Sequence, residues 1–148
     1  MRLSAKGRYA LAATTSMAQY HSNNEYITLI SISEKLGISK IYLEQVFSLL
    51  KHGGIVNSIK GSQGGYQLSS TPQQISAYDI LSAVETSLFE STEETIKDKS
   101  PDIEAAMVHA IFTPIDSVIK TTLQKITLAD LVAEAEKNKG GEGFMFFI

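Results

Sequence analysis

The sequence predicts a mainly α-helical protein, in which a winged helix-turn-helix with a small β-hairpin wing is followed by a long C-terminal dimerisation helix. Three observations lead to this prediction. Two short helical segments meet at a turn that contains Gly37. A helix stop at Gly53-Gly54 leads into two short apolar runs that flank the glycine-rich segment 61–65. From residue 103 to 126, apolar residues recur at three- and four-residue steps.

Capping residues set the expected starts of the first three helices. Ser4, Thr28 and Ser39 can each accept a hydrogen bond from the first turn of a helix. Gly37 and Gly53 can end the second and third of these helices. The expected spans are residues 5–20, 29–36 and 40–52.

Two local patterns define the elements that follow. The apolar runs around Ile55–Ile59 and Tyr66–Leu68 flank glycines that supply positive φ angles, which predicts a hairpin. Ser76 and Asp79 have the spacing of a capping box, which predicts a helix ending near Glu85.

The charged, turn-rich segment 89–102 is the expected linker between a DNA-binding domain (residues 1–88) and a C-terminal region (103–148). Pro114 should interrupt the long helix near residues 110–113. A second capping box at Thr127–Asp130 should open a short helix that ends at Gly140-Gly141.

The long helix carries a broad apolar face. We expect this face to pair with a second copy of the chain, because a helix-turn-helix reaches successive half-sites through two-fold symmetry. The alternative is that the helix packs only on its own domain. The expected interface residues are Ile103, Met107, Ile111, Ile115, Val118, Ile119 and Leu123.

Composition excludes several classes of function. The 148-residue chain has no cysteine, which excludes disulfides, thiolate zinc sites and cysteine-ligated iron–sulfur clusters. His21, His52 and His109 show neither a catalytic arrangement nor metal-ligand spacing, so we expect neither an enzyme nor a metal site. No run of about 18 apolar residues suggests a membrane span. A cytoplasmic protein without a membrane partner is expected.

The net charge of −3 is unevenly distributed. Residues 1–68 hold seven Lys/Arg and three acidic residues, a net +4, whereas residues 69–148 hold six Lys and thirteen acidic residues, a net −7. A basic first half is typical of a protein that binds nucleic acid through one end. Double-stranded DNA is therefore the expected partner.

The expected DNA contacts fall into three groups. Basic residues near the first helix should bind phosphates, exposed residues of the third helix should reach base edges, and the wing should approach the minor groove. For Glu44, the alternative is a solvated helix charge. The candidates are Arg2, Lys6 and Arg8 for the first group; Lys40, Glu44, Gln45 and Ser48 for the second; and Lys60, Gly61, Ser62, Gln63, Gly64 and Gly65 for the third.

The segments MRLSAKGRYAL (1–11), ISKIYLEQVFSLLK (38–51) and IKGSQGGYQL (59–68) closely resemble the Rrf2 family of bacterial transcriptional regulators. ISAYDILSAVE and ITLADLV extend the resemblance over nearly the whole chain. It implies a homodimeric regulator, most often a repressor, that binds a palindromic operator. Ile41 stands where family members have a small polar residue, and Lys60 where many have Arg.

Some members of this family carry an iron–sulfur cluster on three cysteines, and the absence of cysteine here leads us to expect no cofactor. His109 lies where the family's ligand histidine would fall, and we interpret it as structural.

The C-terminal tail resembles the cluster-free branch of cysteine-metabolism repressors known as CymR. That resemblance implies that the tail binds cysteine synthase; the alternative is a tail that packs on its own dimer. For the function of the protein, the alternatives are a regulator of another pathway and a protein that acts mainly through its tail on a metabolic enzyme. The tail residues are Phe144, Met145, Phe146, Phe147 and Ile148.

Overall fold

The computed structural model describes residues 2–20, 25–61 and 64–146, with the backbone alone from 140 to 146. Residues 21–24, the wing-tip residues Ser62 and Gln63, and the tail residues Phe147 and Ile148 lie outside the described residues. The elements in chain order are α1 (Ala5–Ala18), α2 (Leu29–Leu36), α3 (Lys40–His52), β1 (Val56–Ile59), β2 (Gly65–Leu68), α4 (Ala77–Val84), α5 (Pro101–Met107), the π-helical segment η2 (Val108–Phe112), α6 (Thr113–Lys125) and α7 (Leu128–Phe146).

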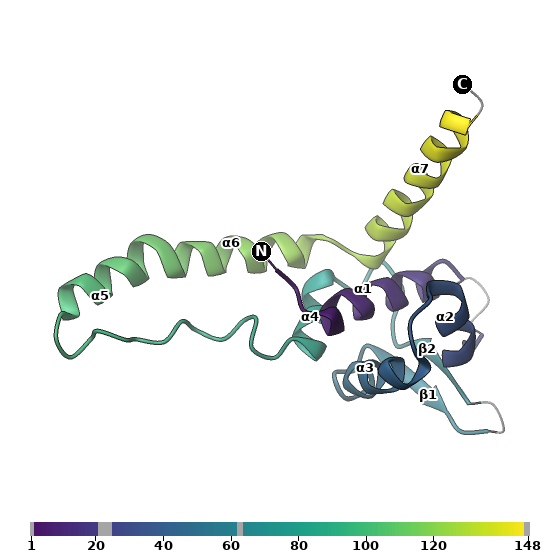
Figure 1. The fold of residues 1–148 in the computed structure, drawn as a ribbon, viewed down its shortest axis with the longest axis horizontal. Helices are drawn as coiled ribbons and strands as arrows, with labels where there is room; N and C mark the ends of the chain where they lie inside the picture. Colours follow the sequence, from purple (N-terminus) through teal and green to yellow (C-terminus); the bar gives the residue numbers. More distant parts are fainter. Residues whose placement is uncertain (1, 21–24, 62–63, 147–148) are drawn as a thin grey trace.

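The winged helix-turn-helix is confirmed. Helices α1–α4 and the hairpin form one body, with the hairpin extending beyond α3 (Figure 1). Strands β1 and β2 pair antiparallel, with Val56 opposite Leu68 and Ile59 opposite Gly65. Gly64 has φ of +62°, as the tight return between the strands requires.

The predicted helix starts are confirmed by their hydrogen bonds. The hydroxyls of Ser4, Thr28 and Ser39 accept from the backbone N–H groups of Gly7, Ser31 and Tyr42. Both predicted capping boxes also form: Ser76 and Asp79 exchange bonds of 2.9 and 3.0 Å, and Thr127 and Asp130 exchange bonds of 2.9 and 3.1 Å. These contacts are local, so short sequence patterns were sufficient to predict them.

A buried core joins the winged helix to the start of α7. Phe47, Met17, Ile32 and Ile80 are among its fully buried side chains. Leu128, in the first turn of α7, is also completely buried in this core. Its backbone N–H donates to the Ile75 carbonyl at 2.9 Å. The region around residues 126–132 is therefore packed on the winged helix, although it follows the long helix in sequence.

Helices α5 and α6, with η2 between them, form one elongated unit, which we call the arm. The arm extends away from the winged helix (Figure 1), and no described side chain of η2 or α6 is buried. The interruption predicted from Pro114 is confirmed, because the π-helical turn ends immediately before Thr113-Pro114. Proline cannot donate the hydrogen bond of a regular helix and its ring crowds the preceding turn, which accounts for the wider turn at this point.

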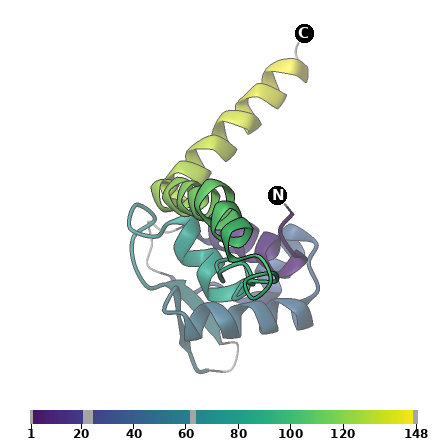
Figure 2. The same ribbon diagram turned by 90° about the vertical axis from the view of Figure 1, so that its left-hand side faces the viewer.

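Two sequence predictions are wrong. The first helix was expected to reach residue 20, but α1 ends at Ala18 and Tyr20 is exposed, with Lys35 Nζ lying 4.5 Å from its ring centroid. Gly140-Gly141 was expected to end the last helix, but α7 continues through both residues to Phe146. A glycine costs a helix only about 1 kcal/mol, so it need not stop one. Figure 2 shows α7 leaving the body at an angle to the arm.

Across the part of the chain that the structure describes, no helix combines the length and apolar character needed to cross a membrane.

Candidate nucleic-acid interface

Helix α3 has one buried face and one exposed face. Leu43, Val46, Phe47 and Leu50 are fully buried in the core. The predicted base-contacting residues Lys40, Glu44, Gln45 and Ser48 are all exposed on the opposite side. The spacing of 44, 45 and 48 places these three side chains on one stripe of the helix. The fold thus brings these predicted residues together on a free surface.

Aromatic contacts hold α3 at a fixed angle in the body. The Tyr42 ring meets the Tyr9 ring of α1 edge-on, with centroids 5.1 Å apart and an interplanar angle of 87°. The Phe47 ring packs on the Tyr66 ring of the wing, with the two ring centroids 4.8 Å apart. Tyr9 is partly buried and packs against the core. These contacts couple the orientation of α3 to both α1 and the hairpin.

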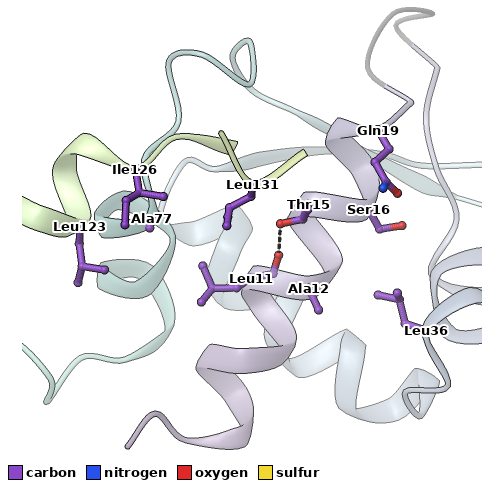
Figure 3. A pocket seen from close by; sticks show the side chains of 10 residues that line it. All are labelled: Leu11, Ala12, Thr15, Ser16, Gln19, Leu36, Ala77, Leu123, Ile126 and Leu131. Atoms are coloured by element: carbon purple, nitrogen blue, oxygen red, sulfur yellow. Dashed lines mark hydrogen bonds between the residues drawn. The ribbon is translucent and has the colours of Figure 1, made fainter. Parts of the chain in front are cut away.

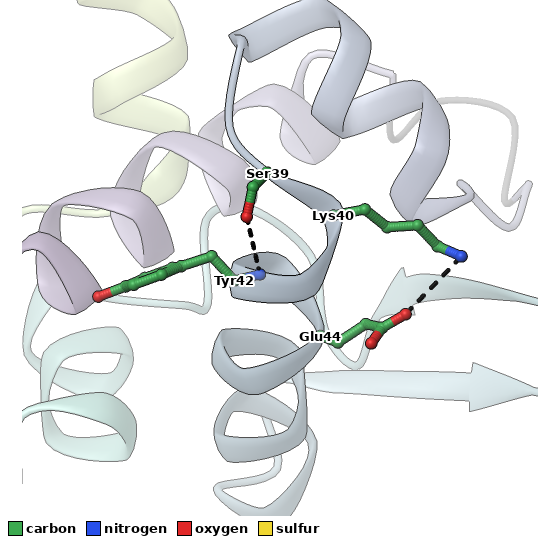
Figure 4. Close-up of polar contacts among 4 residues, drawn as sticks. All are labelled: Ser39, Lys40, Tyr42 and Glu44. Carbon is green, nitrogen blue, oxygen red and sulfur yellow. Dashed lines mark hydrogen bonds and ion pairs between the residues drawn. The ribbon is translucent and has the colours of Figure 1, made fainter.

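The first turn of α3 combines a cap with an ion pair (Figure 4). Ser39 Oγ accepts from the Tyr42 N–H at 3.1 Å, while Lys40 Nζ lies 3.7 Å from Glu44 Oε1. Lys40 and Glu44 extend together away from Tyr42, on the solvent side of the helix. Both side chains are about half exposed, so the pair adds little to stability and can exchange its partners for DNA groups.

A groove of about 440 Å³ separates α3 from the wing. Lys40 and Lys51 of α3 and Lys60, just after β1, line this groove, and so does Glu44, the ion-pair partner of Lys40. Three ammonium groups around one groove provide a positive field that can attract a phosphate backbone. Sequence reasoning missed Lys51, although its seven-residue spacing from Glu44 was a signal that it shares the exposed face of α3.

The basic start of α1 is tied to the end of α4. Glu85 accepts hydrogen bonds from the backbone N–H of Ser4, at 3.0 Å, and from the Ser4 hydroxyl. Gly7 permits this approach, because a Cβ at that position would lie 2.5 Å from Glu85 Oε1. Arg2 and Arg8 are exposed on either side of this contact and Lys6 is partly exposed. Sequence reasoning missed Glu85, since a contact across 81 residues leaves no local pattern.

The apolar residues predicted for the dimer interface lie along the arm. Ile103, Ile111, Ile115 and Val118 are exposed, with Val118 at 64%. Met107, Ile119 and Leu123 are partly buried. Within the described residues of η2 and α6, no side chain is buried.

An apolar depression of about 420 Å³ lies where the arm and α7 join the winged helix (Figure 3). Leu11 of α1, Leu123 and Ile126 at the end of the arm, and Leu131 of α7 extend into it. Thr15 lies at its wall with its hydroxyl already donated to the Leu11 carbonyl at 2.7 Å. The apolar surface of the arm therefore extends onto the winged helix.

The segment between α4 and the arm is fastened by Glu104. This side chain is only 3% exposed, and its Oε1 accepts from the Ile96 N–H at 3.3 Å. Nearby, Lys97 and Glu94 form an ion pair at 2.9 Å. The hydrogen bond and negative charge of Glu94 raise the pKa of Lys97 above its ordinary value. Glu104 had no distinguishing sequence signal, because it resembles the other acids of this region.

Comparisons with known proteins agree with this geometry. A family model described as Rrf2, iron-dependent transcriptional regulator, matches residues 3–134. The HTH-type transcriptional regulator IscR of Erwinia tasmaniensis is 38% identical over 136 residues, which cover 92% of this chain and 81% of that protein.

Two solved structures have the same overall fold. The structure of CymR (YrzC), described as the global cysteine regulator of B. subtilis, has a TM-score of 0.73 and 35% identity, covering 90% of this chain and 98% of that one. The structure of T. potens IscR has a TM-score of 0.73 and 31% identity, covering 99% and 96% of the two chains.

The iron in the family description does not fit the residues of this chain. The chain has no cysteine, and the described residues hold no group of three or more His, Asp or Glu side chains placed to bind a metal ion. His109 lies exposed on η2. The segment that precedes the arm is instead fastened by the carboxylate of Glu104.

Proposed function

Because the chain belongs to the Rrf2 family of transcriptional regulators, we propose that it is a homodimeric repressor that binds a palindromic DNA operator through α3 and the wing. Its homologues are transcriptional regulators rather than enzymes. A regulator of this kind acts on chromosomal DNA, so we place it in the cytoplasm without a membrane partner.

One observation carries the DNA half of the proposal: the exposed stripe of α3 lies directly beside the lysine-lined groove. Glu44 can accept from a cytosine amine and Gln45 can pair with an adenine. Lys40, Lys51 and Lys60 can neutralise neighbouring phosphates from the groove. A surface with both kinds of group can distinguish sequences and also bind DNA strongly.

The arm supports the dimer half of the proposal. Ile111, Ile115 and Val118 form a solvent-exposed apolar stripe along η2 and α6. A second copy would cover this stripe through two-fold symmetry, and the resulting pair of winged helices could reach two half-sites.

We further propose a role in cysteine or sulfur metabolism, supported by the similarity to the CymR structure. In this proposal, cysteine synthase binds the tail formed by Phe144–Ile148 and adjusts the affinity of the regulator for DNA. Helix α7 supports this idea because it reaches Phe146 while leading away from the winged helix (Figure 1). The alternative function is a protein-interaction regulator that acts mainly through this tail on a metabolic enzyme and not on DNA.

A binding experiment tests the DNA half. The duplex that binds best is selected from a randomised pool, and its affinity is measured by fluorescence anisotropy at several salt concentrations. Lys60→Ala should lower affinity for all duplexes and reduce the salt slope by about one unit. Glu44→Ala and Gln45→Ala should relax discrimination at particular base pairs, by about 1–3 kcal/mol for a bidentate contact.

Matched variants on α7 provide the controls. Lys137→Ala and Glu136→Ala remove the same charges from an exposed surface far from α3, and they should leave affinity and salt slope unchanged. Equal affinity of the wild type and all three α3 and wing variants for the selected duplex would contradict the proposed interface.

A further inference from the structure

The recognition surface contains an apolar side chain that the polar contacts do not explain. Ile41 is 72% exposed, the highest fraction among the large apolar side chains that the structure describes. It lies in the first turn of α3, next to Lys40, and none of the described elements covers it. Burying such a side chain on folding would stabilise the protein. Its exposure in the free protein is accounted for if the side chain is buried against DNA in the complex.

Ile41 shares its helix face with the proposed base-reading residues. Positions 41, 44, 45 and 48 follow the i, i+3, i+4, i+7 spacing of a single helical stripe, and all four side chains are exposed. Leu43 and Phe47 anchor the opposite face in the core. In helix-turn-helix proteins, the first residues of the second helix contact base edges. Ile41 therefore stands at the end of the stripe that would lie deepest in the groove.

The chemistry of the major groove offers one group that suits this side chain. Isoleucine has neither a donor nor an acceptor, so it cannot read the polar edges of guanine, adenine or cytosine. Thymine alone adds a methyl group, at C5, to the surface of the groove. We propose that Ile41 is a specificity-determining residue that contacts the C5-methyl group of a thymine in each operator half-site.

The backbone and side chain of Ile41 are well suited to this contact. Ser39 caps the turn and the Tyr42–Tyr9 contact holds it against α1, so the position of the Ile41 Cα is fixed before DNA arrives. A β-branched side chain in a helix also strongly favours one χ1 rotamer. Little conformational freedom is then lost on binding. The neighbouring Lys40 and Glu44 exclude a large apolar protein partner from the same patch, because such a partner would desolvate both charges.

This inference rests on the DNA-binding function proposed above, and a chemical substitution in the DNA tests it. In the duplex selected from a randomised pool, each thymine is replaced in turn by uracil, which removes only the methyl group. For the wild type, replacing one symmetry-related pair of thymines should weaken binding roughly fourfold per methyl, the equivalent of one buried CH₂ group. The same replacement should have no effect on Ile41→Ala.

Ile30→Ala is the matched comparison, because Ile30 is also an exposed isoleucine and lines the same groove, but from α2 rather than from the α3 stripe. This variant should retain the full thymine-to-uracil penalty. Ile41→Val retains a branched side chain and should preserve part of it. Since Ile41 is exposed in the free protein, Ile41→Ala should keep the wild-type melting temperature, which separates the loss of readout from unfolding.

Two results would overturn the inference. One is a wild-type protein that binds every uracil-substituted duplex as well as the thymine duplex. The other is a penalty of the same size in Ile41→Ala and wild type, which would assign the methyl contact to another residue. In both cases sequence-specific binding would persist. Failure of the proposed function would instead appear as a lack of preference for any duplex.

Discussion

The winged helix and the arm contrast in how much of their apolar surface they bury within one chain. In the winged helix, Phe47, Met17 and Ile80 are fully enclosed. In the arm, Ile115 and Val118 are more than half exposed, and the described side chains of η2 and α6 include none that is buried. The winged helix, together with the start of α7, buries its apolar surface within one chain, whereas the arm leaves an apolar face that a further surface would cover.

The largest effect is expected from a charge placed on the apolar face of the arm, which tests whether a second copy of the chain covers that face. Ile115→Asp should dissociate the proposed dimer, because an unpaired carboxylate in its interface would cost about 3–5 kcal/mol. Ile119→Asp should have a similar effect. Sedimentation at micromolar concentration should give two chains for the wild type and one chain, 16.1 kDa, for the variant.

Ser117→Asp is the control for this prediction, because it adds the same charge two residues along the helix, away from the stripe. It should leave the dimer intact. A wild-type mass of one chain would contradict the assignment of the arm as a dimer interface.

The second prediction concerns the point where the last helix joins the core. Leu128 is completely buried although it follows the arm in sequence, so Leu128→Ala should lower the free energy of unfolding by about 2–5 kcal/mol. Urea denaturation followed by circular dichroism measures this change. Val132→Ala, at a half-buried position on the same helix, should cost distinctly less. An equal cost at the two positions would argue against α7 as a part of the winged-helix core.

A third, smaller effect is expected at the contact between α1 and α4. Glu85→Ala removes the carboxylate that holds Ser4, and the loss of this fixed helix start should destabilise the protein by about 1 kcal/mol. The exposed Glu90 provides a control in Glu90→Ala, which should be neutral. Thermal melting compares the two variants. If both melt at the wild-type temperature, the Glu85–Ser4 contact contributes nothing measurable.

The smallest effect on stability is expected at the far end of α7. Deleting Phe147 and Ile148 should leave the melting temperature unchanged, because the anchoring contacts of α7 lie near Leu128. The deletion should nevertheless abolish binding to cysteine synthase, measured by isothermal titration. A lowered melting temperature would instead indicate a tail that packs on its own dimer. Absence of binding by the full-length protein would remove the synthase from the proposal.

Local patterns predicted much of the fold. The caps at Ser4, Thr28 and Ser39 and the capping box at Ser76 depend on groups within a few residues, so their side-chain chemistry was visible in the sequence. The interruption before Pro114 was predictable for the same reason, since it follows from the ring itself.

Contacts between distant residues were not predictable in this way. The burial of Leu128 and the contact between Glu85 and Ser4 depend on how elements meet in space, which neither periodicity nor capping records. The placement of Gly140-Gly141 inside α7 was missed because glycine lowers helix stability without excluding a helix. The exposed stripe of α3 was predicted from its helical spacing, and its contacts with DNA remain predictions.

The π-helical turn η2 has a consequence for the phase of the arm. Ile103, Met107, Ile111 and Ile115 recur every four residues, and in a helix of 3.6 residues per turn this spacing would rotate the side chains by about 120° from first to last. A π turn accommodates one extra residue and turns the following helix back by about 100°. The π turn therefore keeps the apolar side chains from Ile103 to Ile115 nearly in line along one face of the arm. In an uninterrupted α-helix, side chains four residues apart would drift around the helix instead.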